Sequence, residues 1–244
     1  MADPLIMRSK NHYYPDGSVT VQVGGILYRL FASMLARNSD VFADLFSIPP
    51  TDDPEGITDD KPIKLAMIPV FDFECLMDFL FRGPNMNKPH SIEFLRGLLH
   101  LSTRWEIPDG REYAIECLEK HCSFDYMYRL RFGVRYHVQD WIEPAFKHLA
   151  EPSVFLHELD RTRIENVLGL PVYLRLVEVK SRIDLHRRYL AFSPPPFQSG
   201  LSCKSSQACK ETWLKMWLNG PAKMLIHPEL PLSLILPQYP HRFG

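Results

Sequence analysis

Apolar and polar residues alternate between residues 18 and 23, which is the pattern of a half-buried β-strand. Valine occupies every second position from 19 to 23, with polar residues between, and this period of two places the valines on one face of a strand. Gly24-Gly25 fits a tight turn, and the residues ILYRL at 26–30 supply a partner strand. The pattern therefore predicts two adjacent strands with one face available to a core.

The stretch LFASMLARNSDVFADLF, residues 30–46, predicts two short helices separated by a break. Apolar residues at i, i+3 and i+4 give the first helix one face, made of Phe31, Met34 and Leu35. Asn38 tolerates the left-handed conformation that ends a helix, and Ser39 is a good N-cap for the next one, with Asp40 adding negative charge to its first turn. The second helix is expected to bury Val41, Phe42, Leu45 and Phe46.

The chain beyond the second helix continues as a mixture of loop, strand and helix. The elements expected are an acidic, proline-rich loop at 49–62, a short strand at 63–65, a helix ending near Gly83-Pro84, a helix at 91–105 and a helix at 111–122. Ser91 caps the fourth of these, whose broad apolar face is made of Ile92, Leu95, Leu98, Leu99 and Leu101. Pro108-Asp109-Gly110 is expected to separate the last two helices.

Residues from Tyr126 to about Ala191 keep a helical pattern with short breaks and contain no strand pattern. A linker follows at Ser193-Pro194-Pro195-Pro196, because proline excludes helix, and a short helix is expected around 213–218. We therefore predict an α+β fold: a small sheet with helical hairpins, followed by a mainly helical C-terminal extension. The predicted domains are residues 15–122, 123–192 and 193–244, and the sequence leaves open whether the last segment is ordered.

One helix in the extension is strongly charged. The segment from Arg175 to Arg188 carries five basic and two acidic residues. Its apolar residues are expected to form one packing face, made of Leu176, Val177, Val179, Ile183 and Leu185. The basic residues are therefore expected to form a solvated side of the helix rather than a nucleic-acid-binding surface.

Composition and charge exclude several classes of partner. Lys and Arg number 28 against 29 Asp and Glu, so the chain has no basic field that would draw it to nucleic acid or an anionic membrane. The longest apolar runs fall far short of the ~20 residues that span a bilayer, and the N-terminus shows no signal-peptide pattern. We expect an intracellular protein with no nucleic-acid or membrane partner.

The five cysteines do not form a disulfide framework, and we expect reduced thiols and no cofactor. Cys203 and Cys209 invite a zinc interpretation, but five residues separate them, and zinc knuckles use two to four. Free or buried thiols are favoured over zinc. His157-Glu158 lacks the second histidine of a metalloprotease helix, since residue 161 is Arg161. No catalytic or metal-binding residues are therefore expected.

Three stretches of the chain together resemble one known family. They are SVTVQVGGILYRLFASMLARNSDVFADLF at 18–46, FDFECLMDFLFRG at 71–83 and LLHLSTRWEIPDGREYAIECLE at 98–119. They are similar to the strand hairpin, hinge, third core helix and closing helical pair of the BTB (POZ) domain. The layout also resembles the BTB-only proteins of basidiomycete fungi. The resemblance implies a non-enzymatic protein-interaction module that associates with itself and has no chemistry of its own.

The resemblance also indicates where partners are expected to bind. For self-association, the residues expected at the contact are Tyr13, Tyr14, Ser33 and Arg37, because tyrosine combines apolar area with a polar tip. The alternative is that both tyrosines simply cover the hairpin edge. A second role, as substrate adaptor of a cullin ubiquitin ligase, would use Phe46 and Ile48. Cullin-binding members tend to carry an apolar-x-Glu motif where this chain has Pro50-Thr51-Asp52.

Overall fold

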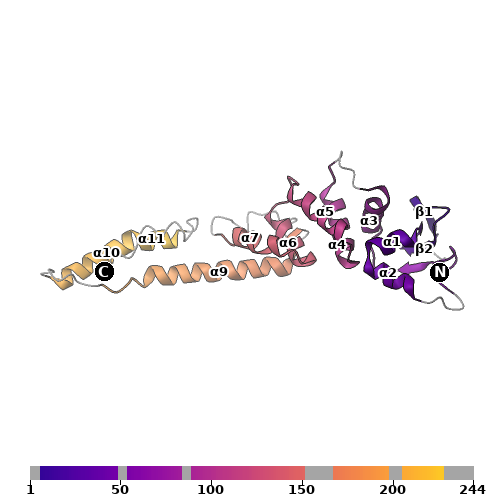
Figure 1. Ribbon diagram of the computed structural model, residues 1–244. Helices are drawn as coiled ribbons and strands as arrows, with labels where there is room; N and C mark the ends of the chain where they lie inside the picture. The colour runs from indigo at the N-terminus through magenta and orange to yellow at the C-terminus, as the bar shows by residue number, and fades with distance from the viewer. Residues whose placement is uncertain (1–5, 49–53, 84–88, 152–166, 198–204, 228–244) are drawn as a thin grey trace. The chain divides into compact units, whose positions relative to one another are not determined.

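The computed structural model describes residues 6–48, 54–83, 89–151, 167–197 and 205–227 (Figure 1). The chain divides into two compact units, unit 1 at residues 1–124 and unit 2 at residues 125–244. Unit 1 contains a sheet and helices, whereas the described residues of unit 2 form helices. The α+β class predicted from the sequence is confirmed. The three-part domain division stays a prediction.

The sheet of unit 1 has four strands in the order β1-β3-β2-β4. Strands β2 (Val19–Val23) and β3 (Ile26–Leu30) pair antiparallel, with Val21 opposite Tyr28, which confirms the predicted hairpin. Gly24 takes φ +57° in the turn, a left-handed conformation that glycine adopts without a steric cost. The predicted strand at 63–65 is β4 (Ile63–Leu65), and it pairs in parallel with β2.

Strand β1 (Met7–Tyr13) has no counterpart among the elements predicted from the sequence. It pairs in parallel with β3 at the sheet edge, and its register shifts between Arg8 and Tyr13. Because of this irregularity, its two buried residues, Ser9 and His12, are three positions apart rather than two. The strand therefore lacks the alternating apolar pattern by which the hairpin was recognised.

The hinge after the hairpin consists of α1 (Ala32–Asn38) and α2 (Asp40–Ser47), as predicted. The reason given for the break was wrong, because Asn38 has no positive φ. Ser39 instead adopts an extended backbone, and its Oγ accepts a hydrogen bond from the Phe42 amide. The same hydroxyl donates to the carbonyl of Trp105. One buried serine thus ends α1, caps α2 and ties the hinge to a distant part of unit 1.

Replacing Ser39 with alanine should destabilise unit 1 more than an ordinary lost N-cap. The cap bond contributes about 1 kcal/mol, and a buried carbonyl left without its donor costs about 1–3 kcal/mol more. Ser91→Ala is the matched control, because Ser91 caps its helix at the same 3.2 Å but is exposed. In urea denaturation, equal losses for the two variants would contradict the second role of Ser39.

The longer helices in the described part of unit 1 are α3 (Val70–Arg82), α4 (Ile92–Arg104) and α5 (Pro108–Glu119). Helix α3 ends before Gly83, as predicted, and Ser91 caps α4. Pro108-Asp109-Gly110 was expected to lie between two helices, but it forms the first turn of α5. Proline suits this position because the amide hydrogen it lacks would have no helical partner there.

The core of unit 1 lies between the sheet and these helices. All five residues predicted for the apolar face of α4 are buried. The largest fully buried side chains of unit 1 are Tyr28, Phe73, Leu30, Leu35, Leu76, Met77, Leu95, Leu98, Leu99, Leu101 and Ile107. Tyr28 and Phe73 meet edge to face with ring centres 4.7 Å apart, which joins β3 to α3.

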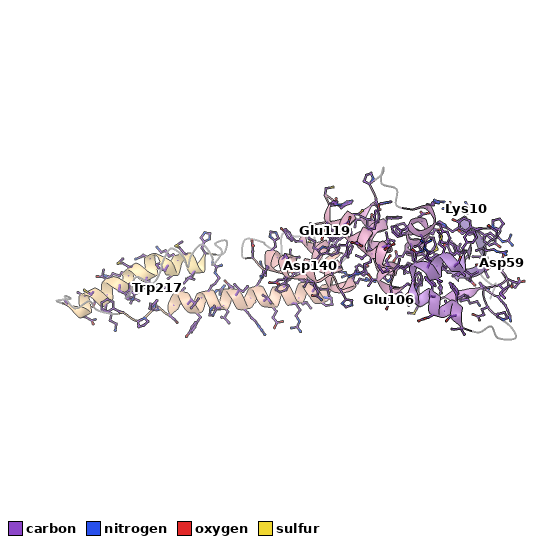
Figure 2. All side chains as sticks on the ribbon, in the orientation of Figure 1. Lys10, Asp59, Glu106, Glu119, Asp140 and Trp217 are labelled. Carbon is purple, nitrogen blue, oxygen red and sulfur yellow. The ribbon has the colours of Figure 1, made fainter. Side chains whose placement is uncertain are left out.

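Unit 2 is built on a 23-residue helix, α9 (Leu170–Phe192). A first apolar cluster joins it to α6 (Tyr126–Tyr136) and α7 (Gln139–Ala150), and includes Leu130, Ala145 and Leu176. A second cluster joins it to α11 (Pro221–Ile226) through Ala191, Ala222 and Leu225. Helix α10 (Ser206–Asn219) is longer than the predicted helix at 213–218. Its Trp217, labelled in Figure 2, donates to the Ala191 carbonyl at 2.8 Å.

The predicted packing face of the charged helix is wrong in two respects. Leu176 is buried as expected, but Val177 and Leu185 are exposed. Arg187, assigned to the solvated side, is only 3% exposed. Its Nε donates to the Leu225 carbonyl at 2.8 Å, and its Nη2 donates to the His227 carbonyl at 2.6 Å. Arg187 therefore satisfies carbonyls at the C-terminus of α11, where a cation is favoured.

Within the described parts of the chain, no helix is both long and apolar enough to cross a membrane.

Candidate interaction surface

Helix α2 and its C-terminal end expose a row of apolar side chains, two of which were predicted from the sequence to be buried. Val41, Leu45 and Ile48 are 38%, 37% and 64% exposed, and they recur at i, i+4 and i+7 along α2 and its end. We call these three residues the α2 stripe. Of the four residues predicted to be buried here, Phe42 is buried and Phe46 is half-buried, so the prediction fails for Val41 and Leu45.

The short length of the hinge helices explains this exposure. Each packs one residue fully into unit 1, Leu35 from α1 and Phe42 from α2. Phe42 contacts Trp105 with ring centres 5.0 Å apart, and the Ser39–Trp105 hydrogen bond fixes the same approach. The remaining apolar residues of α2 lie to the side of this single contact. Met34 on α1 is 37% exposed for the same reason.

Two of the residues expected at a self-association contact lie on or beside β1. The Tyr13 hydroxyl donates to the Asp59 carboxylate at 2.8 Å, and Arg8 lies over the Tyr13 ring and pairs with the same carboxylate at 2.7 Å (Asp59 is labelled in Figure 2). Burial raises the pKa of Asp59, but the hydrogen bonds from Tyr13 and Arg8 outweigh it and hold that pKa below its ordinary value. Tyr13 is thus half-buried in a polar cluster.

Tyr14 is half-buried in an aromatic cluster. Its ring stacks on Phe81 with centres 5.3 Å apart and contacts Phe31 at 5.4 Å. These contacts join the end of β1 to α3 and to the residue before α1. Both tyrosines thus make contacts within unit 1, and whether they also meet a partner stays a prediction.

The other expected contact residues lie on the hinge helices. Ser33 and Arg37 are both exposed on α1, four residues apart and so on one side of that helix. Phe46 stacks on Phe42 with ring centres 6.0 Å apart, and Ile48 is exposed at the end of α2. Sequence reasoning missed Val41 and Leu45 as surface residues, because periodicity gives the direction of an apolar face and not its depth.

A fully buried carboxylate joins α3 to α4. Asp72 is 0% exposed, and its carboxylate lies 2.7 Å from both Arg96 Nη2 and His100 Nδ1. Burial alone raises the pKa of Asp72, but the hydrogen bonds from His100 and Arg96 hold it below its ordinary value. Gly97 permits this approach, because a Cβ there would lie 3.0 Å from Asp72 Oδ1. Every carboxylate oxygen is used in holding the helices together.

A buried histidine joins β1 to α3. His12 is 0% exposed, and its Nε2 lies 2.9 Å from Asp78 Oδ1. Burial disfavours the charged ring more than Asp78 favours it, so the pKa of His12 lies below its ordinary value of 6.5. Cys75, also on α3, has its pKa raised to about 12 by burial, which keeps the thiol protonated and unreactive.

The shifted pKa of His12 predicts a loss of stability in mild acid. The unfolded chain binds the proton more readily than the folded one, so the free energy of unfolding should fall as the pH drops from about 7 to about 5. Chemical denaturation at several pH values measures this slope. His12→Gln should reduce it. Part should remain, because burial lowers the pKa of His90 as well; an unchanged slope would contradict the assignment to His12.

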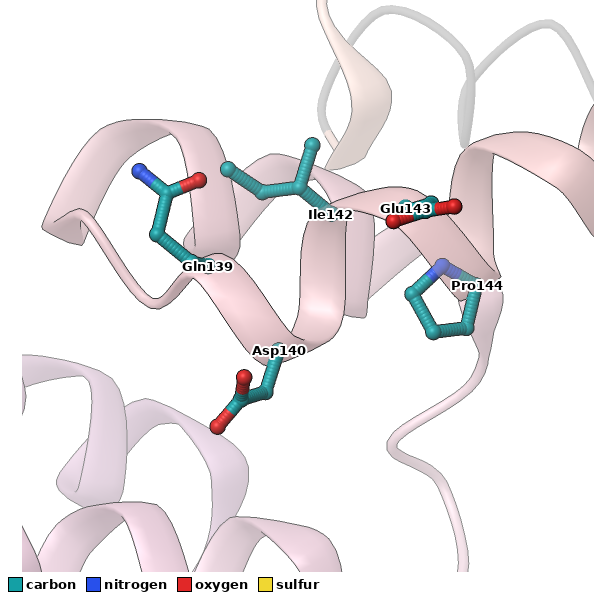
Figure 3. Close-up of a pocket in the computed structure, with 5 residues that line it drawn as sticks. All are labelled: Gln139, Asp140, Ile142, Glu143 and Pro144. Atoms are coloured by element: carbon teal, nitrogen blue, oxygen red, sulfur yellow. The ribbon is translucent and has the colours of Figure 1, made fainter.

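A hollow of about 380 Å³ on α7 does not have the features of a ligand-binding site (Figure 3). Its lining comes from one helix, residues 139–144, and Figure 3 shows Asp140 pointing away from Gln139 and Ile142. Its polar side chains thus do not converge on one ligand position.

Among the residues that the structure describes, no group of three or more His, Cys, Asp and Glu side chains is placed to hold a metal ion. Cys209 is exposed in the first turn of α10 and forms no disulfide. Cys203, the other residue of the zinc hypothesis, lies outside the described residues, as do His157, Glu158 and Pro50-Thr51-Asp52.

No protein-family model matches the chain, and no curated protein matches it.

Proposed function

We propose that the chain is a non-enzymatic protein-interaction protein whose first unit is BTB (POZ)-like and associates with a second copy of itself. The order of elements in unit 1 supports the resemblance: a strand hairpin, two short helices, a short strand and three longer helices. The residues that resemble the family's hinge lie at the junction of α1 and α2, with Ser39 between the two helices.

The α2 stripe is the observation that carries this proposal. Three apolar side chains follow one another along one helix and are bordered by the exposed polar residues Asp40, Asp44 and Ser47. An apolar patch with a polar rim is typical of a protein–protein contact. Removing it from water releases about 25 cal/mol per Å² of apolar surface, and Ser33 and Arg37 supply polar groups on the neighbouring helix.

Two isoleucine variants test whether the α2 stripe mediates self-association. Ile48→Asp places a carboxylate in the contact, whereas Ile57→Asp makes the same change at a residue that is equally exposed, at 60%, but lies outside the hinge helices. Light scattering should show that Ile48→Asp weakens self-association at least about tenfold, because a carboxylate without a partner is costly to bury. Equal effects of the two variants would remove the α2 stripe from the contact.

The cullin-adaptor role is a second candidate, favoured by the exposure of Ile48 at the end of α2. It predicts that a cullin scaffold is recovered with the protein from cells and is lost on Ile48→Asp but retained on Ile57→Asp. If no cullin is recovered while self-association depends on Ile48, the first proposal stands and the adaptor role is rejected.

A further inference from the structure

Among the residues that the structure describes, helix α9 carries apolar residues on two opposite sides, and one of these sides is buried while the other is exposed. Leu176, Arg187 and Ala191 are buried against the rest of unit 2. The opposite side is 40–72% exposed and consists of Leu170, Leu174, Val177, Leu185, Tyr189 and Phe192. We call these six residues the α9 stripe. It extends along the whole helix, and the α2 stripe belongs to the other unit.

Five residues of the α9 stripe lie on a row of positions whose spacing is symmetric about its centre, and Tyr189 lies beside this row. Taking Leu170 as the start and Phe192 as the end, the positions facing the same side are separated by four, three, four, four, three and four residues. Two of these seven positions are not apolar: Ser181, at the centre of the row, and Arg188. Eleven residues make just over three full turns of an α-helix, so the row stays nearly straight along α9 instead of winding around it.

We propose that the α9 stripe binds the same stripe of a second copy, with the helices antiparallel and a two-fold axis at Ser181. This arrangement places Leu170 opposite Phe192 of the second copy and Val177 opposite Leu185 of the second copy. A small residue lies on the axis, where the two backbones approach most closely. The proposal does not depend on self-association of unit 1.

Charge selects the antiparallel arrangement over the parallel one. A parallel pair in register would bring Arg188 against Arg188 of the second copy, which is unfavourable. The antiparallel pair places them 14 residues apart along the axis, about 21 Å, and sets each Arg188 opposite Leu174. The Arg188 stem can then cover this leucine, while its guanidinium keeps its 2.6 Å contact with Asp184 at the margin of the row.

The exposed area is sufficient for a specific contact. Six large side chains exposed to this degree present roughly 700 Å² per copy, close to the ~800 Å² that each partner contributes to a standard interface. The row is about 33 Å long at 1.5 Å per residue, which is enough for several layers of side chains. A flat contact of this size fits a second copy of the same helix.

Cysteine cross-linking in the full chain tests the arrangement directly. Cys122, Cys203 and Cys209 are replaced by serine, and Leu170→Cys and Phe192→Cys are introduced in separate chains of different tag length. Under mild oxidation, a mixture of the two should form a disulfide-linked heterodimer, and each variant alone should form far less homodimer. Equal cross-linking in all three samples would indicate a parallel or random contact, and no cross-link in the mixture would overturn the proposal.

A second pair of variants measures the contribution of the α9 stripe in solution. Leu185→Asp should weaken the α9 contact at least about tenfold, whereas His186→Asp adds the same charge at the next, exposed position outside the α9 stripe. Both are measured in the Ile48→Asp background by cross-linking yield. This readout reports α9 pairing alone, so a failure of the unit 1 proposal leaves it interpretable. Equal yields for the two variants would contradict the assigned face.

Discussion

Asp72→Ala is expected to lower the free energy of unfolding by about 3 kcal/mol, the lower part of the range for breaking a buried ion pair by removing one partner. Asp72 is fully buried, while Arg96 and His100 remain partly accessible and can recover some hydration. At neutral pH the carboxylate is ionised and can only accept, so His100 Nδ1 and the Arg96 guanidinium both donate to it. Removing it takes away the carboxylate to which both donors are bound.

Chemical denaturation monitored by tryptophan fluorescence measures this loss, since Trp105 is buried in unit 1. Asp72→Asn should fall between wild type and Asp72→Ala, because the amide keeps one acceptor oxygen but loses the charge. Glu116→Ala is the control: Glu116 forms an exposed pair with Lys120, and its removal should change stability by less than about 1 kcal/mol. A loss for Asp72→Ala no larger than that of the control would show that the cluster is not a structural clamp.

Arg187→Ala is expected to release α11 from α9. Helix α11 has six residues, too few to persist without tertiary contacts. Its C-terminal carbonyls accept from the buried Arg187 guanidinium, and hydrogen bonds to a charged donor contribute about 1.5–3 kcal/mol each. The expected loss is about 3 kcal/mol of local stability. Hydrogen exchange should show it as faster exchange of the α11 amides.

The control is Arg182→Ala. Arg182 is on the same helix, its side chain is 77% exposed and it pairs with Glu178 at 2.7 Å. Its removal should leave exchange in α11 unchanged, because exposed i,i+4 pairs contribute less than about 1 kcal/mol. If both variants left α11 protected, the Leu225–Ala191 packing alone would hold the helix and Arg187 would have no anchoring role.

The parts of the fold that the sequence predicted are those in which a local pattern and the tertiary environment agree. In the β2–β3 hairpin, valines at every second position meet a turn glycine at φ +57°. Helix α4 likewise has both a capping serine and a face that is buried as spaced. Strand β1 was missed because its buried residues are polar and its register shifts, so that no alternation appears in the chain.

The candidate surfaces were predicted less well, for a physical reason. Periodicity identifies which residues share a side of a helix, but burial depends on what that side meets. Leu45 and Leu185 were placed in the core from their spacing, and both are exposed because their helices bury other residues. Arg187 was placed in solvent from its charge, and it is buried because α11 supplies carbonyls for it. The carbonyls that Arg187 binds belong to Leu225 and His227, which are far from it in the sequence.

The central claim is that this chain binds other copies of itself. Light scattering on the purified full-length protein, from about 1 µM to about 100 µM, measures it most directly. The account predicts an average mass that rises with concentration from one chain to two or more, with Ile48→Asp shifting the rise to higher concentration. A mass of one chain at every concentration would contradict it.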